Sequence, residues 1–388
     1  MTTRPPLATR LPQTSRRRFL QVSAGGVITV GALGAGGLMR PAHAGYDRFT
    51  WISPRGTLEV LDDYGYWAAQ KMGYFGDLDI QIEPGPSGGT ATVQFVDVGQ
   101  ADMGFPSPGV FSFALREGMA LKSVFHQGAR DTFSLAFRRG EAPADIREIE
   151  GKTILLGSAA WQPIVDPMLA AQGVDISTIT YLEAGWPAWG TMLAAGQGDA
   201  ALSWEGLRAE WIATGLDFEY WLGVLNSPLP ANTFVVRASD LEDPERVAFL
   251  ERYLRGWAMG NEFAEHNPLA AVQAVFDQFP TLAQNVGPEL GTMSLIQQAN
   301  VFRGDWESRQ GWGWHDMDSW QRFFDLTAEI GQTDVIDATE VCTNDLIPAA
   351  NDFDVAQVIA DAEAAGTPAG FEDVDVDAIR AGMFDQAI

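Results

Sequence analysis

The sequence has one cysteine and few basic residues, and both shortages exclude classes of protein. Cys342 has no partner in the 388-residue chain, which therefore forms neither an internal disulfide framework nor a thiolate metal cluster. Lysine and arginine total 25 against 51 aspartate and glutamate residues, for a formal net charge of −26. Because nucleic-acid binding depends on clustered basic side chains that displace counterions, we expect no nucleic-acid partner.

The rest of the composition is that of a folded globular protein. Hydrophobic residues make up 46% of the chain, which is enough to build buried cores. The length fits two domains or one large one, and we find no repeat of solenoid period.

The first 44 residues resemble an export signal. They contain six basic residues and no acid, and residues 15–21 (SRRRFLQ) precede a mildly apolar run at 22–39. Residues 42–44 (AHA) have the small-x-small pattern that signal peptidase cleaves. We predict a twin-arginine signal cut after Ala44 and a periplasmic mature protein. The alternative of a membrane anchor is disfavoured by six glycines between Gly25 and Gly37.

One order of elements occurs twice in the remaining chain. We expect a first set of strand 49–53, helix 57–72, strand 78–83, helix 89–98 and strand 103–105, and a second set of strand 152–156, helix 161–171, strand 179–183, helix 186–195 and strand 200–204. Glycines stop the helices at equivalent places, with Gly73 in the first set and Gly173 in the second. Each set is a β-α-β-α-β unit, which predicts parallel strands joined by right-handed crossovers.

Two such units predict an α/β protein with two doubly wound lobes around a ligand cleft, because ligands bind beyond the carboxyl ends of parallel strands. The segments at 133–138 and 232–237 look like strands that leave and re-enter lobe 1, and they are our candidate hinge crossovers. Helical patterns at 244–264, 269–279, 290–302 and 318–330 are expected to pack on lobe 1. A helix at 355–364 is expected to precede a loosely attached end.

The corresponding division of the chain has five parts. They are the signal (1–44), lobe 1 in two segments (45–137 and 237–347), lobe 2 (138–236) and a C-terminal extension (348–388).

Six motifs in this order resemble the periplasmic solute-binding proteins of ABC importers, in the group that includes taurine, alkanesulfonate, nitrate and thiamine-pyrimidine binders. The motifs are residues 69–75 (AQKMGYF), 86–89 (PSGG), 99–102 (GQAD), 156–158 (LGS), 196–200 (GQGDA) and 343–346 (TNDL). The resemblance covers about residues 49–347 and implies a type II periplasmic binding-protein fold. It also implies that the lobes close on one small solute and deliver it to a membrane permease, without covalent chemistry.

The strand-end rule places thirteen candidate ligand contacts in the loops that face the cleft. These are Trp51, Arg55, Thr57, Ser87, Gly88, Gly89, Phe105, Ser107, Ser158, Trp161, Trp186, Trp204 and Glu205. The aromatic rings offer stacking surface for a flat solute, Glu205 has the chemistry to accept from an amino group, and Arg55 has the chemistry to hold a carboxylate or sulfonate. We expect a nitrogen-containing aromatic or heteroaromatic solute, with a sulfonate, taurine or nitrate as the alternative.

Structural roles for these residues stay open at this point. Each tryptophan is also explained as a core residue, and Arg55 and Glu205 as salt-bridge partners. Asp62 and Asp63 are expected inside the first helix, on a solvated face or as partners of the helix dipole, rather than as ligand contacts.

One motif keeps an enzyme open as the alternative. Residues 85–89 (GPSGG) fit the G-x-S-x-G pattern between a strand and a helix, which keeps a serine hydrolase that uses Ser87 as the alternative function. Its base would come from His126, His266 or His315. A cofactor-precursor enzyme on the same fold needs clustered cysteines and histidines, whereas this chain has Cys342 alone.

The group of His315, Asp316 and Asp318 predicts a helix cap rather than a metal site. We therefore predict a monomer that is not an enzyme and holds no metal or cofactor. Its expected partners are a small solute and an ABC transporter permease, and it is not stably inserted in a membrane after the signal is removed.

Overall fold

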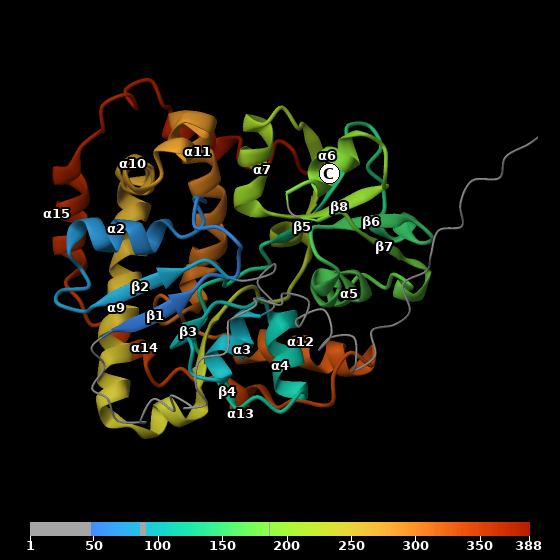
Figure 1. Cartoon of the computed structure of the whole chain (residues 1–388). Coiled ribbons are helices and arrows are strands. Elements are labelled where there is room, and N and C mark those ends of the chain that lie inside the picture. The colour runs from blue at the N-terminus through green and yellow to red at the C-terminus, as the bar shows by residue number, and fades with distance from the viewer. Residues whose placement is uncertain (1–47, 86–90, 186) are drawn as a thin grey trace, which may run out of the picture.

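Two five-stranded sheets form the frame of the computed structural model, which describes residues 48–85, 91–185 and 187–388 (Figure 1). The predicted signal at 1–44 lies outside the described residues. The first sheet has the order β2-β1-β3-β10-β4 and the second β7-β6-β8-β5-β9. We call each sheet with its covering helices a lobe, numbered in that order. The strands are β1 (Phe49–Ile52), β2 (Ile80–Glu83), β3 (Met103–Gly104), β4 (Leu121–Phe125), β5 (Phe133–Arg138), β6 (Thr153–Leu156), β7 (Thr180–Glu183), β8 (Ala200–Trp204), β9 (Phe218–Leu222) and β10 (Phe234–Arg237).

The predicted repeat is confirmed by the strand pairing. In lobe 1, β1 lies between β2 and β3 and pairs with both in parallel; in lobe 2, β6 lies between β7 and β8 in the same way. The connecting helices are α2 (Tyr64–Met72), α3 (Thr92–Asp97), α5 (Gln162–Ala170) and α6 (Trp189–Ala194). The repeated GQxD motif serves the same purpose twice, because Asp102 accepts from Thr50 N at 2.7 Å and Asp199 accepts from Thr153 N at 2.8 Å. Each carboxylate thus fixes the start of the first strand of its unit.

The sheets are mixed rather than purely parallel, which differs from the expectation. Strand β10 runs antiparallel to β3 and β4, and β5 runs antiparallel to β8 and β9. Both strands follow segments in which the chain passes between the lobes, at 126–132 and 223–233, and each therefore enters its sheet from the opposite end. The expected lobe boundaries at 137/138 and 236/237 fall inside β5 and β10.

Long helices cover the outer face of lobe 1, as expected from the sequence. Helices α9 (Pro244–His266) and α10 (Pro268–Gln278) pack on α2, α11 (Pro280–Arg303) packs on α10, and α15 (Val355–Ala365) packs on α9 (Figure 1). Helix α11 is kinked at Gly287, whose φ of 73° favours glycine. It also reaches lobe 2, where Ser294 Oγ donates to the Gly206 carbonyl of α7 (Glu205–Ala213) at 2.8 Å. This contact joins the two lobes beside the crossing segments.

The other face of the first sheet packs on α3, α4 (Pro108–Arg116) and α12 (Met317–Glu329). Asp316 caps α12 by accepting from Asp318 N and Ser319 N, which confirms the predicted helix cap. His315 is buried beside Trp320 and stacks on His126. The shorter helices are α8 (Gly223–Asn226), α13 (Ala338–Val341), α14 (Ile347–Ala350) and α16 (Val376–Ala381).

The C-terminal segment is held firmly, so the expectation of a loosely attached end is wrong. Ile379 of α16 packs in the lobe 1 core, and the chain then crosses to lobe 2. There Tyr220 N of β9 donates to Gln386 O at 2.8 Å, and Ile388 N donates to Tyr220 O at 3.0 Å. Phe384 packs against the lobe 2 core. We call residues 383–388 the strap, because they extend the edge of the second sheet while α16 stays on lobe 1.

Candidate functional site

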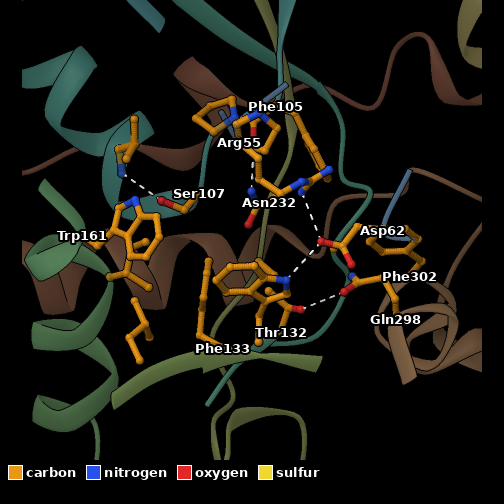
Figure 2. A pocket seen from close by; sticks show the side chains of 18 residues that line it. Arg55, Asp62, Phe105, Ser107, Thr132, Phe133, Trp161, Asn232, Gln298 and Phe302 are labelled. Carbon is orange, nitrogen blue, oxygen red and sulfur yellow. Dashed lines mark hydrogen bonds and ion pairs between the residues drawn. The ribbon is translucent and has the colours of Figure 1, made fainter. Parts of the chain in front are cut away.

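A cavity lies between the lobes at the level of the crossing segments (Figure 2). It encloses about 720 Å³, including the part that is open to solvent. The lining residues come from both lobes, from both crossings and from α11. They are Pro54, Arg55, Asp62, Phe105, Pro106, Ser107, Val110, Gly128, Thr132, Phe133, Trp161, Ile164, Leu202, Trp204, Ala231, Asn232, Gln298 and Phe302.

Lobe 2 supplies an aromatic wall. Trp204 ends β8 and Trp161 ends a short 3-10 turn (Ala159–Trp161), and their rings meet edge to face with centroids 6.1 Å apart. Behind them lies the buried Trp189, which stacks on Trp204 and donates its Nε1–H to Leu202 O at 2.7 Å. The wall is therefore braced from within lobe 2, and it presents a broad apolar face to a ligand.

A few polar groups lie opposite this wall. The Asn232 side chain donates from Nδ2 to the Phe105 carbonyl at 3.1 Å. Ser107 Oγ accepts from Val110 N at 3.3 Å and caps α4. These bonds fix the orientation of each side chain before a ligand arrives.

Arg55 lines the cavity and belongs to a buried cluster of charges. Its guanidinium lies 2.5 Å from Asp63 Oδ1 and 3.3 Å from Asp62 Oδ2. Asp62 and Asp63 are only 4% and 1% exposed, so the expectation of a solvated helix face is wrong. The reason is that α2 begins at Tyr64 and not at residue 57, and the preceding turns direct both carboxylates inward toward Arg55.

Burial and charge act against one another in this cluster. Burial by itself lowers the pKa of Arg55, but the neighbouring carboxylates, chiefly those of Asp63 and Asp62, outweigh it and raise the pKa above its ordinary value. Burial raises the pKa of Asp62, with Arg55 opposing the rise. Burial also raises the pKa of Glu210 on α7 to about 8, and the charge of Asp62 adds to that rise. The cluster thus contains three acidic side chains, Asp62, Asp63 and Glu210, and one basic side chain, Arg55.

One hydrogen bond of this cluster crosses the cleft. Trp204 Nε1 of lobe 2 donates to Asp62 Oδ2 of lobe 1 at 3.1 Å (Figure 2). On α7, the Gly206 Cα lies so close to Asp62 that a Cβ placed there would be 2.3 Å from Asp62 Oδ1. The structure is therefore one in which the lobes are in contact.

Of the thirteen predicted ligand contacts, five line the cavity, namely Arg55, Phe105, Ser107, Trp161 and Trp204. Four others lie elsewhere. Trp51 is in the lobe 1 core among other rings, Thr57 Oγ1 accepts from Glu59 N, and Ser158 Oγ accepts from Ala160 N. Glu205 is fully buried behind the aromatic wall and pairs with Arg208. Ser87, Gly88, Gly89 and Trp186 lie outside the described residues.

Several lining residues were not foreseen from the sequence. Phe133 and Asn232 belong to the segments that were expected as hinges, and a hinge between two lobes lies next to the cleft. The sequence pattern therefore indicated their position. Gln298 and Phe302 come from α11, and nothing local in the sequence marks them.

The described residues that line the cavity include no histidine. His126 and His315 are each 1% exposed in lobe 1, and His266 lies at the end of α9. No group of three or more histidine, cysteine or acidic residues in the described part of the chain is arranged to hold a metal ion. Among the described helices, none has both the length and the apolar character that crossing a bilayer requires.

Comparison with known proteins gives one family and one fold. A model of the NMT1/THI5 like family matches residues 62–270, which is more than half of the chain. No curated protein matches it in sequence.

Among solved structures, it is similar to the alkanesulfonate-binding protein SsuA of Xanthomonas axonopodis pv. citri bound to MOPS, with 14% identity, 77% of this chain and 98% of that chain covered, and a TM-score of 0.57. It is also similar to the periplasmic nitrate-binding protein NrtA of Synechocystis PCC 6803, with 11% identity, 88% and 98% covered, and a TM-score of 0.56. A third similar structure is a DszB mutant in complex with biphenyl-2-sulfinic acid, with 13% identity, 78% and 98% covered, and a TM-score of 0.50. The chain therefore belongs to the NMT1/THI5 like family and has the two-lobed α/β fold of periplasmic solute-binding proteins.

Proposed function

We propose that this chain is the extracytoplasmic solute-binding component of an ABC importer, which binds a small organic solute between its lobes and delivers it to a membrane permease. The observation that carries the proposal is the cavity between the lobes, which has an aromatic wall on one side and oriented polar groups on the other. Such a combination is typical of small-molecule sites. The molecules bound in two of the similar structures, MOPS and biphenyl-2-sulfinic acid, agree with a small organic solute.

The solute that we propose is a nitrogen-containing aromatic or heteroaromatic molecule. Trp161, Trp204 and Phe133 offer far more flat apolar surface than nitrate or taurine occupies. Stacking on such rings contributes about 1 kcal/mol per ring beyond the burial of area. A sulfonate, taurine or nitrate remains the alternative solute.

Binding and delivery would use a hinge at the two crossing segments, 126–132 and 223–233. A ligand drives closure only through contacts that it makes better in the closed state. The hydrogen bond from Trp204 to Asp62 exists only while the lobes are together, and it therefore adds to those contacts.

The test is a thermal-shift screen of the purified chain against amines, pyrimidines, aromatic acids and sulfonates, followed by calorimetric titration. A solute selective for the folded protein raises the melting temperature. Trp204→Leu is expected to weaken its affinity at least tenfold, because the wall loses its central ring. Trp306→Leu is the matched control, since Trp306 pairs with Trp312 and does not line the cavity. Equal losses in both variants, or stoichiometric labelling of Ser87 by an active-site serine probe, would contradict the proposal.

A further inference from the structure

The charges around Arg55 bear on which solutes the cavity accepts. Arg55 is the only basic side chain among the described residues that line it. Both Asp62 and Asp63 contact its guanidinium, and both are almost completely buried, so solvent screens these ion pairs poorly. The cluster is negative when both carboxylates are ionised and neutral when Asp62 holds a proton. It is positive in neither state.

An anion would therefore meet no net positive charge at this site. An arginine receives a carboxylate or a sulfonate when the donors at the end of its guanidinium are available to it, whereas Nη1 and Nη2 of Arg55 are directed to two carboxylates of its own chain, and Nε is buried without a hydrogen-bond partner. A solute anion in the cavity would also lie beside Asp62, which lines it. Placing like charges together in a poorly solvated site is unfavourable. The net charge of −26 adds a repulsive long-range field.

Among the polar groups that lie opposite the aromatic wall, Asn232 presents an acceptor to the cavity. Because Asn232 Nδ2 donates to the Phe105 carbonyl, its Oδ1 is directed away from that bond, and Figure 2 shows it pointing toward the middle of the cavity. An amide oxygen accepts from an N–H or O–H group. A sulfonate, a carboxylate or nitrate has no hydrogen to offer it.

We propose that the cleft excludes anions, because Asp62 and Asp63 cancel Arg55 while Asn232 accepts from an N–H group of the solute. The solute is then an uncharged or cationic flat molecule, and Asp62, Asp63 and Asn232 determine this specificity. The inference rests on the proposed function, since it assigns roles within the same cleft. It separates this chain from the similar sulfonate-binding and nitrate-binding proteins.

The test uses matched probes that differ only in charge. On each of three scaffolds (benzene, pyridine and naphthalene), the aminomethyl, hydroxymethyl and methanesulfonate derivatives are titrated into the purified chain by calorimetry. We expect the amine or the alcohol of at least one scaffold to bind at least tenfold more tightly than its sulfonate. A sulfonate that binds as tightly as its matched amine overturns the inference and leaves the proposed function standing. Failure of every amine and alcohol to bind also overturns the inference.

Variants separate the roles of the charges. Asp63→Asn removes one of the two negative charges that contact Arg55. It is expected to strengthen binding of the sulfonate probe at least tenfold and to weaken binding of the amine. Asp217→Asn is the matched control, because it removes the acid partner of Arg139 at the exposed surface of lobe 2. It should change neither affinity.

A second variant covers the case in which Asp63→Asn does not fold. Asn232→Leu removes the acceptor, and it is expected to weaken the amine at least fivefold with no gain for the sulfonate. Unchanged amine affinity in Asn232→Leu, or unchanged preference in folded Asp63→Asn, would remove these residues from the recognition of the solute.

Discussion

Glu205 and Arg208 form an ion pair in the first turns of α7 that is 0% exposed on both sides. The Arg208 guanidinium also donates to Met383 O of the strap at 3.1 Å and lies over the Tyr220 ring. A buried charge that loses its partner is left without compensation. The geometry therefore favours a structural role for Glu205 over contact with a ligand.

We predict that Glu205→Gln lowers the free energy of unfolding by about 3 kcal/mol, because the Arg208 charge stays buried without a carboxylate. Urea denaturation measures this change. Glu141→Gln, which breaks an exposed pair with Arg138, is the control and is expected to change the free energy of unfolding far less, because solvent screens that pair. If Glu205→Gln has normal stability but no longer binds the solute, Glu205 contacts the ligand and the structural role is wrong.

His315 makes the protein sensitive to acid. Burial lowers its pKa to about 4, although the hydrogen bond to Asn344 opposes the shift. Because the folded pKa is below the unfolded value of about 6.5, the unfolded chain takes up the proton first. This contribution to stability is complete above about pH 6.5 and is lost as the pH falls toward 4. Its size is about 3 kcal/mol, taking about 1.4 kcal/mol per unit of pKa.

The expected result is that His315→Gln reduces the loss of stability between pH 7 and pH 4.5, as measured by urea denaturation at both values. His266→Gln is the control, because His266 is partly exposed at the end of α9, where it contacts Glu262. The idea is wrong if the pH dependence of His315→Gln equals that of the unchanged protein.

At the scale of single residues, only part of the candidate site was predictable from the sequence. The strand-end rule identifies Trp161, Trp204 and Arg55, because their positions follow from where strands end. It cannot tell Trp204 from Glu205, which are adjacent in sequence but face the cavity and the interior of lobe 2, respectively. Gln298 reaches the cavity from a helix whose placement depends on long-range packing.

At the scale of elements, the strap completes the edge of the second sheet. Strand β9 is an edge strand of that sheet, and the strap pairs with it at Tyr220. Unpaired edge strands expose backbone donors and acceptors, and the strap covers those of Tyr220. Since α16 is anchored in lobe 1, the strap connects the lobes in addition to the two crossing segments.

We predict that Phe384→Ala loosens this connection, because Phe384 packs against the lobe 2 core. Hydrogen exchange at the Tyr220 amide, which donates to Gln386 O, is expected to become at least tenfold faster. Asp385→Ala alters the neighbouring exposed residue and should leave that rate unchanged. Equal protection in both variants would show that the strap is not held by this contact.

Element boundaries were harder to predict than element order. The apolar residues at 58, 60 and 61 extend the helical pattern of α2 backward, although the chain there forms turns. The turns place Asp62 and Asp63 beside Arg55, and a carboxylate pair with a buried arginine leaves no periodic signal. Helix α9, by contrast, matches its predicted range closely, because its long apolar pattern is bounded by Pro244 and capped by Asp243.

For the whole molecule, the duplicated unit predicted two lobes and a cleft, and the mixed character of the sheets was missed. Parallel pairing follows from the local β-α-β pattern. The antiparallel strands β5 and β10 depend instead on the path of the chain between lobes, which no local pattern records. The same limit applies to the strap, whose partner strand lies far away in the sequence.

The export route is also a property of the whole chain, and its prediction stands on residues 1–44 alone. We expect the periplasmic form in a bacterium with a twin-arginine pathway to have the mass of a chain that begins at Gly45. Arg16→Lys combined with Arg17→Lys should leave the precursor inside the cell, whereas Arg4→Lys combined with Arg10→Lys should not. Fractionation with mass spectrometry measures both, and normal export of the first pair would refute the route.

The order of the strands along the chain has a consequence for how the molecule is made. All five strands of the second sheet lie between residues 133 and 222, whereas β10, at 234–237, must insert between β3 and β4 of the first. On a ribosome, the second lobe can assemble its sheet before the antiparallel strand β10 of the first sheet and helices α9 to α11 have been synthesised. Lobe 1 is therefore translated first but completes its sheet last. Until β10 is added, the unpaired edges of β3 and β4 on the nascent chain must be protected from pairing with other chains.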